Sequence, residues 1–232
     1  MRKIIQRIHK GIIVSVQAAH GEPLNKPEYL CAMAEAALNG GACAVRMAQP
    51  ENIDYFRQRH PDVPVLGITK PEVIPDNAHE LVYITPSFRD VVALASCCDI
   101  VALDATLRSR PGGESLESIV EACRKAYPDL ALMADIATLE EGLNAEKLGF
   151  DLISTTLSGY TVESRQTLRQ GPDFALLGTL AKQVKTPVVM EGRVWELQEV
   201  TRSFELGAYA VVIGSAVTRP HEITRRFVRA VP

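Results

Sequence analysis

The sequence lacks a strong excess of charge of either sign. Its 232 residues contain 25 Lys and Arg and 28 Asp and Glu, so the formal net charge is −3. Nucleic acids and anionic membrane surfaces attract clustered positive charge. We therefore expect neither nucleic acid nor membrane as a partner, whereas a small anionic ligand needs only a few local arginines.

Cysteine is scarce, and long hydrophobic runs are missing. The five cysteines are an odd number and include no CxxC pair, so we interpret them as small buried hydrophobes in a reducing compartment. The apolar run at 11–16 stops at Gln17, which is too short for a signal-peptide core or a membrane span. We therefore expect a cytoplasmic protein.

No Pro-, Gly- or Ser-rich linker divides the chain, and the composition does not shift between its halves. We therefore expect one domain over residues 1–232. A G-x-G-x-x-G fingerprint is also missing after the first apolar run. Its absence weighs against a dinucleotide-binding, doubly wound sheet, and we expect no cofactor.

The chain does contain short runs of Val, Ile, Leu and Ala, each ended by a polar residue or a glycine. Parallel strands buried on both faces have this nearly continuous apolar character, and helical patterns lie between the runs. The alternation predicts a (β/α)₈ TIM barrel of the phosphate-binding type, with a doubly wound open sheet as the alternative. The eight predicted strands are 11–17, 42–47, 63–70, 100–104, 130–135, 151–156, 187–192 and 209–214.

A ninth run covers residues 81–86 and ends in Pro86. We interpret it as an extended segment inside the third βα unit. Helix-start signals mark several of the intervening helices, including a capping box formed by Thr138 and Glu141. Predicted helices run from Pro27 to Gly40, from Thr138 to Gly149, over 174–184 behind the cap Asp173, from Trp195 to Leu206, and from Pro220 to about residue 230.

The ends of the seventh and eighth runs predict a phosphate site. TIM barrels often bind phosphate between these two loops, through backbone N–H groups and a helix N-terminus. Gly192 and Gly214 lie there, and glycine lets an anion approach the backbone closely. Ser215 follows at once, and the guanidinium of Arg219 is suited to two parallel bonds to a phosphate.

Two charged residues at strand ends are candidates for chemistry. Lys70 ends the third run, where burial would lower its pKa; it suits a general base or a Schiff-base nucleophile. Glu191 ends the seventh run, and a lone carboxylate there needs a partner or a function. An ion pair with Arg46, Lys70 or Arg193 is the structural alternative.

Asp104 and Asp135 end two further runs. Each either bonds sugar hydroxyls or orients a neighbouring cation, and Arg108 or Arg110 is a local partner for Asp104. Together with Glu191 these carboxylates could hold magnesium. No histidine ends a strand, which weakens a zinc or iron site; we expect no metal. His20, just after the first strand, is the one histidine that merits a test.

These same segments resemble the N-acetylmannosamine-6-phosphate 2-epimerase family of bacterial amino-sugar and sialic acid catabolism. The resemblance covers nearly the whole chain, in family order. It departs from the family at Val16, at 47–49 and in the longer segment 71–80. The matching segments are 15–24, 44–46, 67–70, 83–86, 102–111, 132–135, 155–160, 191–193 and 214–220.

The resemblance implies an isomerase that interconverts N-acetylmannosamine 6-phosphate and N-acetylglucosamine 6-phosphate. It implies that Lys70 is the acid/base residue and Glu191 the catalytic glutamate. The residues that it implies for the sugar are Gln17, Arg46 and Asp135, and those for the phosphate are Gly192, Arg193, Gly214, Ser215 and Arg219.

The chemistry requires the open-chain sugar, because its C2–H lies next to an aldehyde. We expect neutral Lys70 to remove this proton, with donors such as protonated Glu191 stabilising the enolate. The acid on the opposite face is either Glu191 or a substrate hydroxyl. A Schiff-base sugar-phosphate aldolase and a non-catalytic sugar-phosphate sensor are the rival functions. The last helix, which carries Phe227 and Val228, packs on its own barrel or on a second copy; we expect a homodimer.

Overall fold

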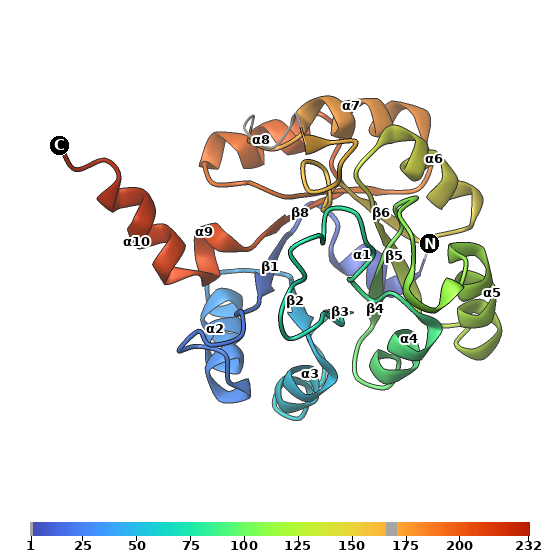
Figure 1. Ribbon diagram of the computed structural model, residues 1–232. Helices are drawn as coiled ribbons and strands as arrows, with labels where there is room; N and C mark the ends of the chain where they lie inside the picture. Colours follow the sequence, from blue (N-terminus) through green and yellow to red (C-terminus); the bar gives the residue numbers. More distant parts are fainter. Residues whose placement is uncertain (1, 166–170) are drawn as a thin grey trace.

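The computed structural model of the protein describes residues 2–165 and 171–232. Eight parallel strands close into a barrel in chain order, with the helices packed around it (Figure 1). This confirms the predicted TIM barrel and rejects the open sheet. The strands are β1 (Ile12–Val16), β2 (Ala44–Ala48), β3 (Val65–Ile68), β4 (Ile100–Asp104), β5 (Ala131–Asp135), β6 (Leu152–Ser154), β7 (Val188–Glu191) and β8 (Ala210–Ile213).

The helices follow the strands in the expected alternation, apart from a short first helix. None of the helices in the described ranges is long and apolar enough to cross a membrane. They are α1 (Lys3–Arg7), α2 (Pro27–Asn39), α3 (Pro50–Arg57), α4 (Phe88–Leu94), the 3₁₀ turn η1 (Pro111–Gly113), α5 (Leu116–Ala126), α6 (Leu139–Lys147), α7 (Phe174–Gln183), α8 (Leu197–Glu205), α9 (Ser215–Thr218) and α10 (Pro220–Val228).

The sequence signals for helix ends are largely confirmed. Thr138 and Glu141 form the predicted capping box, and the Asp173 carboxylate accepts the Leu176 N–H at the start of α7. The helix predicted from Trp195 begins only at Leu197. The reason is that the Glu199 carboxylate accepts the N–H groups of Trp195 and residue 196, at 2.7 and 3.0 Å, and so caps the helix there.

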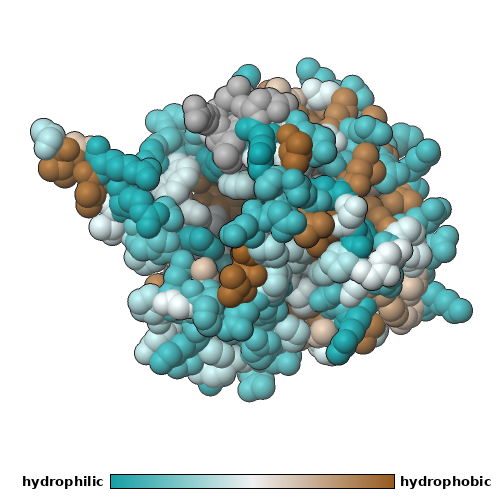
Figure 2. Space-filling model, viewed as in Figure 1, coloured by the Kyte–Doolittle hydropathy of each residue, from teal (hydrophilic) through white to brown (hydrophobic). Residues whose placement is uncertain are grey.

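The predicted final helix is confirmed as α10, and a short helix, α9, precedes it. Arg219 separates α9 from α10 with φ −120° and ψ 80°, because the residue before a proline is displaced from helical geometry. Helix α10 projects away from the barrel (Figure 1) and has no buried residue. Figure 2 shows apolar side chains on this arm, where Phe227 and Val228 are 72% and 61% exposed.

The core has two layers, one inside the barrel and one between the barrel and its helices. All five residues of β4 and all five of β5 are buried, as expected for strands covered on both faces. Ile5 and Ile8, at α1, belong to the inner layer. Four of the five cysteines are buried and Cys43 is half-buried, which agrees with their interpretation as small hydrophobes.

The ninth apolar run is, as predicted, an extended segment and not a barrel strand. Strands β3 and β4 pair only through Leu66 with Ile100 and Gly67 with Val101. Beyond this point the run lies between them: Thr85 N–H donates to the Thr69 carbonyl and Asp104 N–H donates to the Ile84 carbonyl, both at 3.1 Å. Strand β3 therefore ends at Ile68, two residues before Lys70.

Candidate active site

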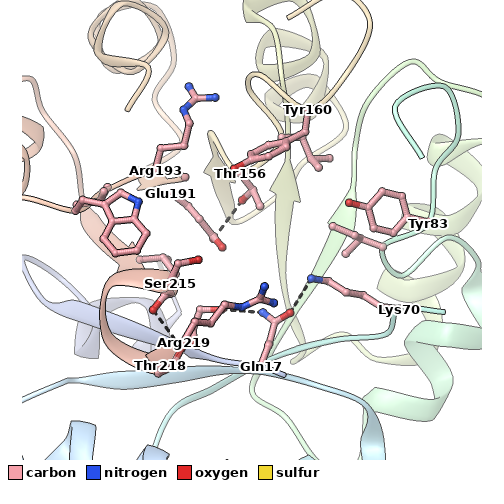
Figure 3. A pocket seen from close by; sticks show the side chains of 18 residues that line it. Gln17, Lys70, Tyr83, Thr156, Tyr160, Glu191, Arg193, Ser215, Thr218 and Arg219 are labelled. Atoms are coloured by element: carbon pink, nitrogen blue, oxygen red, sulfur yellow. Dashed lines mark hydrogen bonds between the residues drawn. The ribbon is translucent and has the colours of Figure 1, made fainter. Parts of the chain in front are cut away.

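A pocket of about 370 Å³ opens at the C-terminal end of the barrel strands. Its walls come from the ends of β1, β7 and β8, from the segments that follow β1, β3, β6, β7 and β8, and from the extended run (Figure 3). The lining residues are Ser15, Gln17, Lys70, Tyr83, Ile84, Thr156, Leu157, Tyr160, Glu191, Gly192, Arg193, Val194, Trp195, Val212, Gly214, Ser215, Thr218 and Arg219.

The Lys70 amine points into this pocket and is held by Gln17 (Figure 3). Lys70 Nζ donates to Gln17 Oε1 at 2.7 Å, and Gln17 Nε2 donates to Ser15 Oγ at 2.7 Å. Burial, reinforced by the positive charges of Arg46 and Arg219, lowers the pKa of Lys70 to about 8. A lysine with this pKa is partly neutral near pH 7, as a general base requires.

Glu191 enters the same pocket and is bound to a buried arginine beneath it. Arg46 Nη1 donates to Glu191 Oε2 at 2.7 Å, and the two Arg46 Nη atoms also hold Asp135, at 3.0 and 2.5 Å. Thr156 Oγ1 bonds both carboxylates, at 2.6 Å to Asp135 and 3.2 Å to Glu191. Arg46 and Asp135 are 1% and 0% exposed and are not among the lining residues; Arg46 is linked to the pocket through Glu191 and Asp135 through Thr156.

Burial shifts the pKa values of Lys70 and Glu191 toward one another. Burial is the main cause that raises the pKa of Glu191, and the nearby Asp135 charge adds to it, against the opposing Arg46 charge. Because Arg46 and Asp135 form an ion pair with no net charge, these two residues together with Lys70 and Glu191 are neutral when one proton resides either on Lys70 or on Glu191. Because buried net charge is costly, these two arrangements are the favoured ones.

Gly192, Gly214, Ser215 and Arg219, which the sequence predicts to bind phosphate, also line the pocket, and we call them the phosphate end. Gly192 has φ +110°, a backbone geometry that favours glycine. A Cβ at Gly214 would lie 3.4 Å from the Ser15 Cβ, so the segment after β8 passes close to strand β1 there. Gly214 caps α9, and Thr218 Oγ1 ties this turn to the Ser15 carbonyl at 2.7 Å.

Arg193 lies at the same end, but its side chain is engaged elsewhere. Its Nη1 donates to the Ser158 carbonyl at 2.7 Å, its Nε donates to the Gly171 carbonyl, and its guanidinium lies 5.9 Å from the Tyr160 ring. The Arg193 backbone has φ +61°.

The remaining sequence candidates lie outside the pocket lining. Asp104 is fully buried and pairs with Arg108 at 2.5 Å, one of the two partners expected. The three carboxylates considered for magnesium are thus all bound to arginines, Asp104 to one and the other two to Arg46. His20 pairs with Glu72 at 2.5 Å, with both side chains more than half exposed.

Sequence reasoning missed several lining residues, among them Tyr83, Tyr160 and Trp195. Thr156, by contrast, closes a run that the sequence marked. Tyr83 lies in the ninth run, where alternation gives no sign that its ring faces a pocket. The available signal is that Tyr83 lies in a ninth apolar run, which eight barrel strands do not need and which ends in Pro86.

Comparisons with known proteins agree on one family. The family model described as "Putative N-acetylmannosamine-6-phosphate epimerase" matches residues 30–232. A protein of Caldanaerobacter subterraneus named "Putative N-acetylmannosamine-6-phosphate 2-epimerase" is 46% identical over 226 residues, covering 97% of this chain and 92% of its own. A Clostridium perfringens protein of the same name is 46% identical over 218 residues, covering 94% and 95%.

A solved structure matches over nearly the whole chain as well. It is that of the N-acetylmannosamine-6-phosphate 2-epimerase from Clostridium perfringens, with a TM-score of 0.90 and 41% identity, covering 99% of this chain and 97% of that one. The thiamine phosphate pyrophosphorylase from Pyrococcus furiosus has a TM-score of 0.61 at 20% identity and shares the fold alone.

Proposed function

The chain belongs to the N-acetylmannosamine-6-phosphate epimerase family, and we propose from this premise that it interconverts N-acetylmannosamine 6-phosphate and N-acetylglucosamine 6-phosphate at C2. The observation that carries the mechanism is the shared pocket. Lys70 and Glu191 both enter it, and the phosphate end closes its other side.

Lys70 is the base in this proposal. In the open-chain sugar the C2–H lies next to the C1 aldehyde, which makes it acidic. Neutral Lys70 takes this proton, the C–H electron pair forms the C1–C2 double bond, and the negative charge passes to the C1 oxygen. Protonation of C2 from the opposite face gives the epimer. Either Glu191 or a substrate hydroxyl donates that proton. The variant Glu191→Gln distinguishes these two donors, because an amide cannot replace the carboxylic acid but leaves the substrate hydroxyl in place.

The buried charges prepare this step. Arg46 holds Glu191 in one position through a 2.7 Å bond, and Asp135 holds Arg46 through two bonds from below. Gln17 directs the Lys70 amine through its 2.7 Å bond. We therefore assign Gln17, Arg46 and Asp135 to positioning of the two reacting groups, and Glu191 to contact with the sugar.

The phosphate end anchors the substrate. Backbone N–H groups at Gly192, Arg193 and Ser215 and the guanidinium of Arg219 supply donors to a dianionic ester, as in other barrels of this kind. Binding energy at this remote group holds C2 near Lys70 and so contributes to the rate.

The proposal is tested by following both epimers by NMR with wild-type protein and with Lys70→Ala. We expect wild-type conversion in both directions and a loss of about 10²–10⁴-fold in the variant, as for removal of a general base. Borohydride treatment with substrate, read by mass spectrometry, tests the aldolase: a reduced adduct on Lys70 contradicts the proposal. Binding of the sugar phosphate without turnover favours the sensor.

We also propose a homodimer formed through α10. An isolated helix of nine residues is marginal in water, and this one exposes Phe227 and Val228 at 72% and 61%. Packing of α10 against a second copy of the chain buries these two side chains. Light scattering after removal of residues 220–232 should show a monomer, whereas a dimer that survives the truncation contradicts this assignment.

A charged phosphate ester does not cross a bilayer, so we place the protein in the cytoplasm, where such sugars are held.

A further inference from the structure

Two features of the molecule have no part in the mechanism above. One is the extended run at 81–86, which the barrel does not need for closure. The other is Asp104, a fully buried carboxylate bound to Arg108 and absent from the pocket wall. They meet at one place: the Asp104 N–H donates to the Ile84 carbonyl at 3.1 Å, next to the pocket residue Tyr83.

Tyr83 presents its hydroxyl to the pocket. In Figure 3 the phenol oxygen points inward on the side of Lys70, across the pocket from Ser215. Within residues 2–165 and 171–232, no group hydrogen bonds this hydroxyl, and it is not among the buried polar atoms that lack a partner. It is therefore an open donor that faces the space a ligand would occupy.

The backbone around Tyr83 is fixed from both neighbouring strand ends. Thr85 N–H donates to the Thr69 carbonyl, and Thr69 N–H donates back to Thr85 Oγ1, both at 3.1 Å. Thr85 is fully buried with φ +44°. A β-branched residue at positive φ is a strained outlier, and such strain persists where the surrounding contacts enforce it and clusters at functional sites.

An arginine clamp holds the same segment from the β4 side. Arg108 donates to the Asp104 carboxylate and to the Ala78 carbonyl, both at 2.5 Å, and to Thr106 Oγ1 at 2.9 Å. Val82 N–H donates to the Ser109 carbonyl at 3.1 Å. Arg110 reaches the Asp104 carbonyl and, at 3.4 Å, the Pro86 carbonyl. The segment that carries Tyr83 is thus bonded at residues 78, 82, 84, 85 and 86.

Tyr83 keeps its proton under working conditions. Burial is the main cause that raises the pKa of this phenol above its ordinary value near 10, with the Asp104 charge adding and the Arg108 charge opposing. A phenol in this state donates a hydrogen bond and does not act as a base near neutral pH. Neutral donors of this kind stabilise enolate oxygens in other isomerases.

We infer that Tyr83 is a catalytic residue that donates a hydrogen bond to the C1 oxygen of the open-chain sugar as it becomes an enolate, and that Asp104 and Arg108 are positioning residues that act through it. The inference rests on the proposed C2 epimerisation. With the phosphate at the opposite end, the reacting end of the sugar lies beside Lys70, and the C1 oxygen is one bond beyond the carbon next to C2. The phenol on the Lys70 side is placed for that oxygen.

The decisive variant is Tyr83→Phe, which removes one oxygen atom that has no protein partner in the described ranges. We expect kcat to fall about 10²–10³-fold, as for loss of one oxyanion donor, with KM changed by less than about threefold. Tyr29→Phe, which removes a phenol hydroxyl at a site 43% exposed on α2, is the matched control and should retain wild-type kcat. An unchanged kcat in Tyr83→Phe overturns the inference, and a raised KM with unchanged kcat overturns it too, because that phenol would bind a group that does not change during reaction.

The positioning role is tested by a double-mutant cycle. Asp104→Asn should lower kcat in the wild-type background but have less than about a twofold effect in the Tyr83→Phe background, since the oxygen that it positions is gone. Equal losses in the two backgrounds contradict action through Tyr83. If Asp104→Asn does not fold, Arg108→Lys tests the same clamp. Lys70→Ala in parallel keeps the proposals separate, because its loss of turnover supports the base whatever Tyr83→Phe shows.

Discussion

The pH dependence of turnover follows from the surroundings of Lys70. Burial and the charges of Arg46 and Arg219 lower its pKa to about 8, from an ordinary value of 10.5. The neutral amine is the reactive form, so activity rises with pH as Lys70 loses its proton and levels off above its pKa. The useful window is pH 7 to 9.5, because the substrate phosphate titrates near pH 6.

The expected size of the rise separates a perturbed lysine from an ordinary one. With a pKa of about 8, the neutral fraction grows from about 9% at pH 7 to about 97% at pH 9.5, so kcat/KM should rise about 11-fold and then level off. An ordinary lysine would give a rise of about 300-fold over the same window, with no plateau.

The assay is integration of the two epimers by ¹H NMR, which needs no coupling enzyme with a pH dependence of its own. The Cε chemical shift of ¹³C-labelled Lys70, assigned by its loss in Lys70→Ala, gives the same pKa without turnover. A rate that still climbs tenfold per pH unit at pH 9.5, or a Cε titration near 10.5, would refute the reasoning from burial.

Three further variants test the rest of the site. Arg46→Met leaves two buried carboxylates without their cation and should cost about 3–5 kcal/mol in urea unfolding; a loss below about 1 kcal/mol contradicts the buried network. Arg219→Gln should raise KM about 10–100-fold through a lost charged hydrogen bond and move the Lys70 titration to higher pH, because a positive neighbour is removed; an unchanged KM excludes Arg219 from the phosphate. Gly192→Ala, at φ +110°, should lose about 1–3 kcal/mol of stability and also raise KM. The control Gly149→Ala, at φ +79° just after the C-terminal end of α6, should lose stability alone. Equal KM values in the two variants contradict an anion at Gly192.

The barrel could be predicted from the sequence because its strands are covered on both faces. Strand β4 coincides with the predicted 100–104, and every residue in it is buried. The predicted 151–156 was too long, since β6 ends at Ser154. There the chain turns, and Thr155 Oγ1 donates to the Glu191 carbonyl at 2.9 Å. The pattern of apolar residues does not reveal where side-chain hydrogen bonds of this kind end a strand.

The charged strand ends could be identified from the sequence, but their partners could not. Arg46 and Asp135 are predicted to hold the sugar, and the structure shows that Arg46 binds both Asp135 and Glu191. Asp135 and Glu191 lie 89 and 145 residues after Arg46 in the chain. Which carboxylate this arginine reaches depends on how β2, β5 and β7 are staggered in the barrel. Tyr83 was missed for a similar reason, since its orientation depends on an arginine clamp about 25 residues further along the chain.

The hydrogen at C2 gives the most direct test of the central claim, that the Lys70 amine removes it. Wild-type protein should be run with N-acetylmannosamine 6-phosphate in D₂O, with C2 followed by NMR, beside Lys70→Ala. We predict product that carries deuterium at C2 with the wild type, and product formation and exchange that are both about 10²–10⁴-fold slower with the variant. Product that retains its original hydrogen at C2, or exchange at the wild-type rate without Lys70, would contradict the account.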